Sequence, residues 1–294
     1  MAGGNLNNLD RDSLKIQQHC PICLSRLTIV LKSAIRTINK KSNEVVELRE
    51  CNNCKHWWHS PMPTQQYLSS LYEGNSKFVN SAHPLEPPED LMKKFNSGCT
   101  TSDIDYNGIS LGLYTELISM KEFNYLEIGC GNGELFRRFC VNAKVCYAVD
   151  PLKQLNLPNI VMDIMDLPKG LKFDVIVIND VLEHLESPLG MLKFCKNIAN
   201  KGARIYCSFP NKDSWLARIK KEKWDMVMPV GHLHYFSRES VSVLFKTSKW
   251  RIIEQYAHPG AGIFWRSILR ARWKIFLNDF IHLYSQWYVN GVAE

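Results

Sequence analysis

The sequence predicts an α/β protein built on a doubly wound, mostly parallel β-sheet, with a small N-terminal ribbon in front of it. Three observations support this fold class. Apolar runs typical of buried strands alternate with helical patterns from residue 106 onward, a glycine-rich turn follows the first of these strands, and two Cys-x-x-Cys pairs precede them all. A sheet of this kind binds its ligands at the carboxyl ends of the strands.

The composition of the 294 residues is that of an ordinary globular protein. Hydrophobic residues make up 45% and charged residues 22%, which excludes disordered and fibrous classes. No uncharged stretch is long enough for a membrane-spanning helix, and the start lacks the features of a signal peptide, so we expect a cytoplasmic protein. The net charge of +7 suits an anionic substrate and falls short of a nucleic-acid-binding signature.

The paired cysteines predict a structural zinc site. Cys20 and Cys23 form one pair and Cys51 and Cys54 the other, and four thiolates complete a tetrahedral zinc site with no open position. Free or oxidised cysteines are the alternative, and a redox motif is disfavoured because no βαβ pattern surrounds the pairs. The six single cysteines are expected to be small core residues, since cytoplasmic thiols stay reduced.

The chain divides into four parts on this basis. We expect a zinc ribbon and a following helix over 1–72, a linker rich in Gly, Asn, Ser and Pro over 73–104, an α/β domain over 105–262, and an aromatic-rich helical tail over 263–294. The ribbon strands are expected over 27–32 and 44–48, and its helix over 65–72.

The elements of the α/β domain follow in order. We expect strands over 124–128, 144–149, 160–163, 173–178, 203–208 and 250–256. Helices are expected over 107–120, from 134 to about 141, and over 187–200. A seventh strand cannot be assigned, and the tail is the segment that could take its place.

The glycine-rich turn indicates a nucleotide-like cofactor. Gly129, Gly131 and Gly133 let the backbone approach a ligand closely, and Asp150 ends the next strand, where a carboxylate can bind ribose hydroxyls. The spacing favours S-adenosylmethionine (SAM) over a dinucleotide, because the dinucleotide fingerprint would require glycine where Glu134 stands. Glu127, inside the first strand, could bind the ammonium group of SAM.

These motifs resemble a known family. LEIGCGNG at 126–133, VD at 149–150 and FDVIVINDVLEHL at 173–185 look like class I SAM-dependent methyltransferases, over about residues 106–257. The cysteine pairs and the PMPT segment at 61–64 are similar to a zinc-ribbon branch found in bacterial surface-glycan and secondary-metabolite pathways. The resemblance implies SAM as methyl donor.

The resemblance also implies roles for individual residues. The methionine end of SAM would be lined by Glu127, Gly129, Gly131, Gly133 and Asn179. The ribose would bind Asp150, and the adenine would lie against Pro151, Asp163 and Ile164.

Three interpretations of the chemistry stay open at this point. In the first, His184, His232 or His234 is a general base for a hydroxyl acceptor. In the second, Asp180, Glu183, His184 and His232 bind Mg²⁺ or Mn²⁺, which lowers the pKa of the acceptor hydroxyl, similar to sets in small-RNA 2′-O-methyltransferases and ubiquinone-pathway O-methyltransferases. In the third, Glu183 and His184 only hold the loop, and catalysis rests on proximity.

The expected acceptor is a hydroxyl on a small anionic molecule, such as a nucleotide-linked sugar or glycan precursor. The segment 213–224 supplies four basic residues and two tryptophans that could cover this acceptor, or form a solvated basic helix. The alternatives are RNA 2′-O-methylation, which the charge favours less, and a non-catalytic SAM-binding or zinc-ribbon interaction module. The tail could pack on the sheet, on a partner subunit or against a membrane surface, and the sequence does not determine the oligomeric state.

Overall fold

The computed structural model describes residues 14–31, 36–39, 44–64, 105–106, 109–110, 120–131, 133–151, 157–228, 231–259 and 285–294. The expected helix over 65–72, the linker and most of the tail lie outside these residues. The expected helix over 107–120 does not begin as predicted, because β7 (Asp105–Tyr106) and β8 (Ile109–Ser110) form a short antiparallel pair. Residues 111–119 lie outside the described part.

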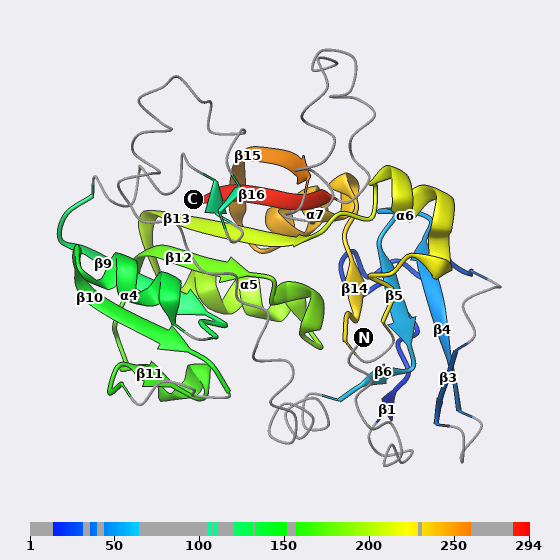
Figure 1. The fold of residues 1–294 in the computed structure, drawn as a ribbon, viewed down its shortest axis with the longest axis horizontal. Coiled ribbons are helices and arrows are strands. Elements are labelled where there is room, and N and C mark those ends of the chain that lie inside the picture. The colour runs from blue at the N-terminus through cyan, green and yellow to red at the C-terminus, as the bar shows by residue number, and fades with distance from the viewer. Residues whose placement is uncertain are drawn as a thin grey trace, which may run out of the picture.

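The larger sheet has seven strands and confirms the predicted fold class (Figure 1). Its strands are β9 (Phe123–Ile128), β10 (Ala143–Val149), β11 (Ile160–Val161), β12 (Phe173–Asn179), β13 (Ala199–Pro210), β15 (Trp250–Pro259) and β16 (Ser285–Ala293). They are arranged in the order β11-β10-β9-β12-β13-β16-β15. Neighbours from β11 to β13 pair in parallel, whereas β16 is antiparallel to both of its neighbours.

The end of the tail is a strand, which corrects the expectation of a helix there. Residues 285–293 form β16, inserted between β13 and β15, and supply the seventh strand that could not be assigned. Trp287, Tyr288 and Val289 are buried in succession, as expected for a central strand covered on both faces. An apolar run of this kind is equally typical of a buried helix. Only the strands that it pairs with in the folded chain distinguish the two structures.

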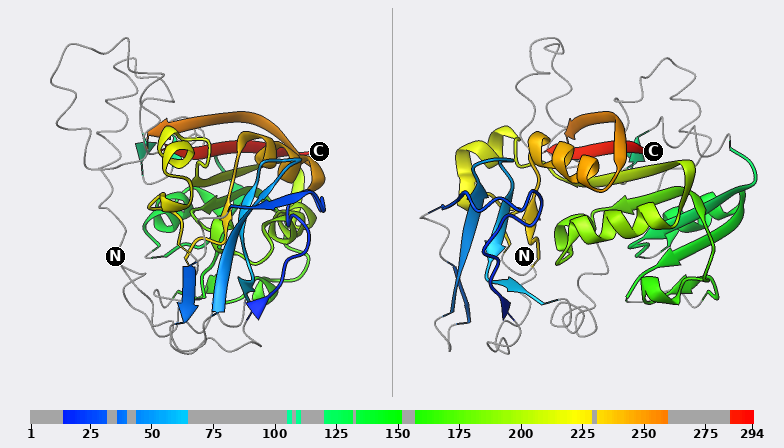
Figure 2. Two further views of the ribbon diagram at one scale, coloured as in Figure 1. Left: turned by 90° about the vertical axis from the view of Figure 1, so that its right-hand side faces the viewer. Right: turned by 180° about the vertical axis from the view of Figure 1, so that it is seen from behind.

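Helices cover both faces of this sheet. Alternate strand residues divide into two cores, because successive side chains of a strand point to opposite faces. Phe136 and Phe139 of α4 (Glu134–Cys140) pack on the face that carries Tyr125. On the other face lie α5 (Pro188–Asn197), which begins with a Ser187 cap, and α7 (Arg238–Thr247), which begins with a capping box (Figure 2). None of the helices in the described residues has the length and apolarity to cross a membrane.

The N-terminal ribbon is a separate antiparallel sheet beside the larger one (Figure 1). Its order is β14-β5-β4-β2, made from β2 (Thr28–Val30), β4 (Glu44–Cys51), β5 (Trp57–Ser60) and β14 (His234–Tyr235), with β3 (Arg36–Asn39) also paired to β4. A further pair joins β1 (Leu14–Lys15) to β6 (Met62–Pro63). The ribbon sheet therefore contains β14, a strand from the C-terminal half of the chain.

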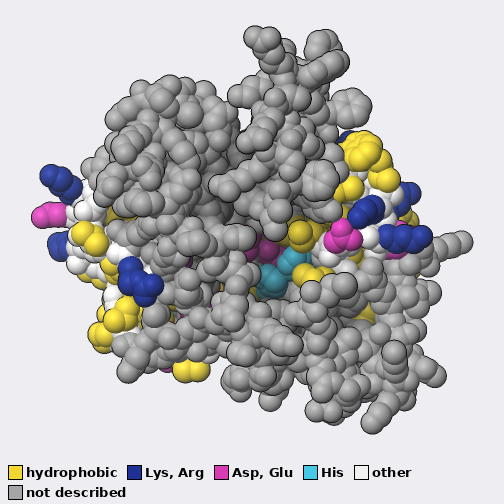
Figure 3. Space-filling model, in the orientation of Figure 1, with side chains coloured by type: hydrophobic (Ala, Val, Ile, Leu, Met, Phe, Trp, Pro, Cys, Tyr) yellow, Lys and Arg dark blue, Asp and Glu magenta, His cyan; other side chains and the backbone are white. Residues whose placement is uncertain are grey.

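The ribbon and the α/β domain also share buried side chains. Trp58 and Met62 belong to the same apolar cluster as the core of the larger sheet. Trp57 belongs to a second cluster with Trp224 and with Leu216 of α6 (Trp215–Lys220). In the space-filling view, histidine and acidic side chains are visible together in the middle of one face (Figure 3).

The placement of β16 makes a testable prediction. Trp287 is 3% exposed and its Nε1 donates to the carbonyl of Phe236, so Trp287→Ala should lower the free energy of unfolding by about 3–5 kcal/mol, measured by urea denaturation. Arg251→Ala on the adjacent β15 is the control, because that side chain is 62% exposed. Equal stability of the two variants would contradict a central position for β16.

Candidate active site

The turn between β9 and α4 requires glycine for both conformation and space. Gly129, Gly131 and Gly133 have φ angles of 77°, 50° and 66°, in the left-handed region that side chains rarely adopt. At Gly129 a Cβ atom would also lie 2.2 Å from Cγ2 of Val181, the residue that precedes the loop helix after β12. The backbone therefore carries no side chain at these three positions, which directly follow the end of β9.

Asp150 follows β10 directly and supports this turn. Its Oδ2 accepts a hydrogen bond of 2.8 Å from the amide of Gly131, and the residue is 6% exposed. The parallel pairing of β9 with β10 brings the glycine turn and Asp150 to the same edge of the sheet, as the spacing predicted. Pro151, next in the chain, is exposed.

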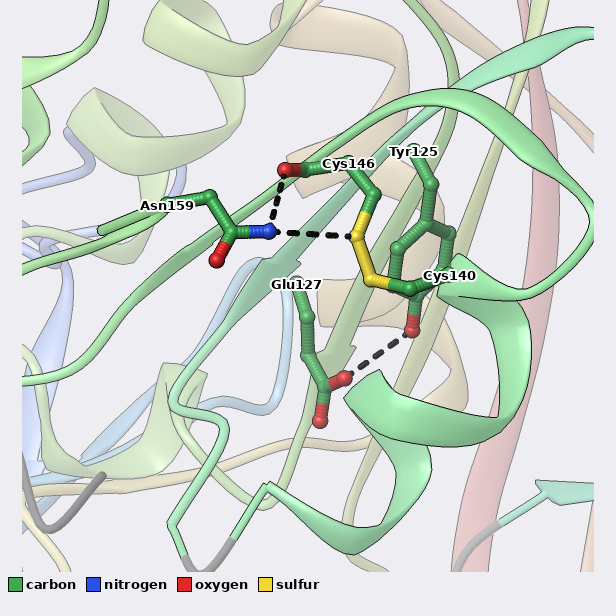
Figure 4. Close-up of a disulfide and its surroundings, with 5 residues drawn as sticks. All are labelled: Tyr125, Glu127, Cys140, Cys146 and Asn159. Carbon is green, nitrogen blue, oxygen red and sulfur yellow. Dashed lines mark hydrogen bonds between the residues drawn. A yellow bond between two sulfur atoms is a disulfide. The ribbon is translucent and has the colours of Figure 1, made fainter. Parts of the chain in front are cut away.

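Glu127 is a buried carboxyl group one strand residue before the turn. Its Oε2 accepts a hydrogen bond of 3.0 Å from the hydroxyl of Tyr125 (Figure 4). The pKa of Glu127 is raised to about 8, chiefly by burial; the Tyr125 hydrogen bond opposes this rise and the nearby Asp150 charge adds to it. A cation beside Glu127 and Asp150 would compensate both carboxylates.

The same view corrects one expectation about the single cysteines. Cys140 at the end of α4 and Cys146 in β10 form a disulfide and are not separate core thiols. Their Cα atoms are 5.5 Å apart because α4 returns directly into β10. Cys130, Cys195 and Cys207 are free and buried, as predicted.

The remaining predicted cofactor residues lie on the same side of the sheet. Asp163 caps the short helix η4 (Ile164–Asp166) by accepting from the amide of Met165, and Ile164 packs against the core. Asn179 ends β12, and its Nδ2 is buried without a hydrogen-bond partner among the described residues. A buried donor of this kind lacks the acceptor that buried polar groups normally have, and an acceptor atom of a ligand would satisfy it.

A second group of side chains comes together where the loop after β12 meets the loop before β14. Ligand atoms of Glu183, His184 and His232 all lie within 4.8 Å of one another. The ring centroids of the two histidines are 4.8 Å apart, and Nε2 of His184 is 3.8 Å from Oε1 of Glu183. The amide of Leu233 donates to the carbonyl of Glu183 over 2.7 Å, which joins the two loops.

The hydrogen bonds of the two rings fix their tautomers. Nδ1 of His184 lies 2.8 Å from the carbonyl of Gly231, and Nδ1 of His232 lies 3.0 Å from the carbonyl of Met226. Since a carbonyl only accepts, each Nδ1 carries the proton and each Nε2 keeps its lone pair. Burial lowers the pKa of both histidines, that of His232 to about 3, so both rings are neutral near pH 7.

Glu183 completes this cluster as a buried acid. It is 1% exposed, and burial together with the charge of Asp180 raises its pKa well above the usual value. Its Oε2 has no hydrogen-bond partner among the described residues. A carboxyl oxygen of Glu183 and the ring nitrogen lone pairs of His184 and His232 thus lie close together. This set of atoms is typical of a binding site for a divalent metal ion.

Two other predicted residues are not part of this cluster. The Oδ1 of Asp180 accepts hydrogen bonds from Ser208 and from Gln286 of β16. His234 is fully buried, and its two ring nitrogens contact His56 and the carbonyl of Leu185. Both nitrogens of His234 are therefore occupied inside the protein.

The four ribbon cysteines converge as the two pairs predicted. Sγ of Cys20 lies 3.6 Å from that of Cys54, and Sγ of Cys23 lies 3.4 Å from that of Cys51. Zinc–sulfur bonds of 2.3 Å at tetrahedral angles would place the sulfurs about 3.8 Å apart. The cluster is consistent with a zinc site.

Sequence reasoning missed two residues that contact the segment after His232. His56 and His59, which flank the Trp57–Trp58 pair, bond His234 and the hydroxyl of Tyr235. The signal available in the sequence was their position: two histidines beside a metal-binding knuckle in an otherwise apolar strand need buried polar partners.

A comparison with known families finds a match over the greater part of the chain. Residues 75–255 match the family described as "Methyltransferase domain", which is more than half of the chain. The chain therefore belongs to this methyltransferase family.

Individual relatives are more distant. An uncharacterised protein of Methanocaldococcus jannaschii is 31% identical over 102 residues, covering 33% of this chain and 50% of its own. A ubiquinone biosynthesis O-methyltransferase of Coxiella burnetii is 26% identical over 165 residues, covering 51% of this chain and 66% of its own. The chain thus spans between half and two thirds of the length of these relatives.

Solved structures of methyltransferases are similar at lower identity. Magnesium protoporphyrin IX methyltransferase from Synechocystis PCC 6803, with bound S-adenosylhomocysteine, has a TM-score of 0.46 at 15% identity, over 78% of this chain and 98% of its own. N-methyltransferase NodS from Bradyrhizobium japonicum, also with bound S-adenosylhomocysteine, has a TM-score of 0.40 at 15% identity, over 70% of this chain and 97% of its own.

The pKa of Glu127 predicts how SAM affinity depends on pH. Below a pKa of about 8 the free protein holds a proton on Glu127, and a cationic ligand must displace it, so affinity should rise with pH by up to about tenfold per unit between pH 6 and 8. Calorimetric titration at several pH values measures this slope. Glu127→Gln is the control, and an equal slope in both proteins would contradict the prediction.

Proposed function

We propose that this methyltransferase methylates a hydroxyl group of a small anionic acceptor, such as a nucleotide-linked sugar or glycan precursor. The observation that carries the proposal is the cluster of Glu183, His184 and His232, which lies within 4.8 Å and offers two unprotonated ring nitrogens. A hydroxyl must lose its proton as it accepts a methyl group, and this cluster provides for that step. The O-methyltransferase among the relatives supports a hydroxyl acceptor.

Two structural observations fit SAM at the edge formed by β9, β10 and β12. At Gly131 no atom lies within 4 Å of the position that a Cβ would take, and Asn179 presents a buried donor without a partner among the described residues. SAM supplies an activated methyl group when it is bound. The residues proposed to hold it are Glu127, Gly129, Gly131, Gly133, Asp150, Pro151, Asp163, Ile164 and Asn179.

We infer that the cluster acts with a divalent ion, Mg²⁺ or Mn²⁺, and not through a single histidine base. An imidazole with a pKa of about 3, as at His232, is a weak base near neutral pH. Its neutral state suits a metal ligand, and Oε2 of Glu183, which has no hydrogen-bond partner in the part of the chain that the structure describes, suits a bound cation. Such an ion lowers the pKa of a bound hydroxyl.

The proposed ligand set has three members, in place of the four suggested by the sequence. Asp180 is left out because its Oδ1 accepts from Ser208 and Gln286. The neighbouring residues hold the ligands in place: Gly231 and Met226 accept the Nδ1 protons of the two histidines and so direct both Nε2 lone pairs.

The basic segment around α6 supports an anionic acceptor. Arg218, Lys221 and Lys223 are exposed there, and Trp215 is 47% exposed and free to stack on a ring, whereas Trp224 is buried in the core. The same charge favours RNA as a second candidate, for which 2′-O-methylation would be the reaction. Transfer of labelled methyl groups from SAM to sugar nucleotides or to RNA distinguishes the two.

The ribbon is proposed to bind one structural zinc ion. Purified protein should contain about one zinc per chain, because four thiolates close the coordination shell, and Cys54→Ser should lose it. Metal analysis by mass spectrometry measures the content. Cys195→Ala is the control, since Cys195 is buried in the α/β core, and native protein without zinc would contradict the site.

The divalent ion makes a separate prediction. His184→Ala should weaken Mn²⁺ binding at least about tenfold and lower turnover, while SAM affinity stays the same, because the side chain acts on the acceptor. Electron paramagnetic resonance measures free Mn²⁺, and His19→Ala is the control that keeps the ion, because the His19 ring bonds Arg26 at an exposed position.

Brief EDTA treatment should abolish turnover, and added Mg²⁺ or Mn²⁺ should restore it, whereas the closed cysteine site resists such treatment. Turnover that ignores EDTA would contradict the metal and favour a histidine base.

A further inference from the structure

We propose that the N-terminal ribbon positions the acceptor-side residues, with His56, His59 and Tyr235 as positioning residues for His184 and His232. This inference rests on the function proposed for the Glu183–His184–His232 cluster. In this inference the ribbon is more than a stable folding unit, because it also holds His184 and His232 in the orientation that acts on the acceptor.

The first connection is through the backbone. β14 pairs antiparallel with β5, with His234 opposite Trp58 and Tyr235 opposite Trp57. The amide of His59 donates to the carbonyl of Leu233 over 3.2 Å, which extends the pairing toward His232. β14, which begins two residues after His232, is therefore an edge strand of the ribbon sheet.

The second connection runs from His59 through Tyr235. The Tyr235 hydroxyl donates to the carbonyl of His232 over 2.8 Å, so its oxygen can only accept from its other partners. These are the amide of Met228 at 3.1 Å and Nε2 of His59 at 3.0 Å. One hydroxyl thus bonds both Met228 and His232, at the two ends of this loop. Met228 lies two residues after Met226, and the carbonyl of Met226 orients the His232 ring.

The third connection runs from His56 through His234 to the loop that carries His184. Nε2 of His234 lies 2.9 Å from the carbonyl of Leu185 and must donate, so its Nδ1 accepts. Nε2 of His56, 3.0 Å away, therefore donates to that Nδ1. Leu185 directly follows His184, so this pair of rings fixes the end of the helix that holds Glu183 and His184.

The three connections leave the cofactor edge untouched. In the described residues, none of these hydrogen bonds reaches the glycine turn or Asp150, which are held by β9 and β10. Altering the ribbon histidines should therefore change the geometry of the acceptor-side cluster and leave SAM binding as it was. A ribbon that only stabilised the protein would not separate the two properties.

The test uses Mn²⁺ as the probe of the cluster in full-length protein. Tyr235→Phe keeps the ring and removes only the hydroxyl, and His59→Leu removes the donor to it. Both variants should bind Mn²⁺ about tenfold more weakly, with SAM affinity within about twofold of wild type and zinc content unchanged. His59→Gln, whose amide can donate to Tyr235, should restore most of the affinity.

The matched control is His19→Leu. His19 is also a ribbon histidine, but its ring bonds Arg26 at an exposed position and reaches neither loop. A loss of Mn²⁺ affinity in His19→Leu equal to that in His59→Leu would overturn the inference, as would unchanged affinity in both Tyr235→Phe and His59→Leu.

A second readout keeps the inference separate from the proposed function. In ¹⁵N-histidine-labelled protein, two-bond correlations report which ring nitrogen of His184 and His232 carries the proton. Tyr235→Phe and His59→Leu should disturb the Nδ1–H pattern of these rings, and His19→Leu should not. If wild-type protein binds no Mn²⁺, the proposed metal is wrong, and the ring pattern alone decides the inference: disturbed rings support it and unchanged rings overturn it.

Discussion

β14 leaves the α/β domain and joins the ribbon sheet by pairing with β5, and the arrangement of the acceptor side depends on this pairing. It brings His232 beside His184, although the two belong to different loops. The pairing in turn depends on β5 following the second cysteine pair, where Ser237 also bonds the carbonyl of Cys54. The four-cysteine cluster and the histidine cluster are thus connected through one short strand.

The cofactor side obeys a different constraint, the convergence of strand ends at one edge of a parallel sheet. Glu127 and Asp150 are both buried there; burial raises the pKa of Glu127, and the charge of Asp150 adds to the rise. Two carboxyl groups so close are costly without a cation, so this edge is electrostatically suited to a positively charged ligand. The two halves of the site meet at Val181, whose side chain occupies the space opposite Gly129.

Much of the fold, and the meeting of the glycine turn with Asp150, could be predicted from the sequence, because both depend on local patterns. Apolar runs identified the six assigned strands, and the spacing from the glycine turn to Asp150 placed these residues together, since consecutive parallel strands end at the same edge. The acceptor side could not be predicted in the same way. The sequence offered His184, His232 and His234 alike as the general base, and only their partners separate two rings whose Nε2 keeps its lone pair from a ring with both nitrogens occupied.

The sequence by itself therefore determined the fold class, the cysteine set and the glycine turn, each of which follows from spacing along one segment. Tertiary structure alone decided three other features: that residues 285–293 insert as a strand between β13 and β15, that Asp180 bonds Ser208 and Gln286 and lies outside the cluster, and that His56 and His59 reach the acceptor loops. The physical reason is the same for all three. Hydrogen bonds between segments far apart in the chain leave no periodic trace in either segment, so their partners become visible only when the chain is folded.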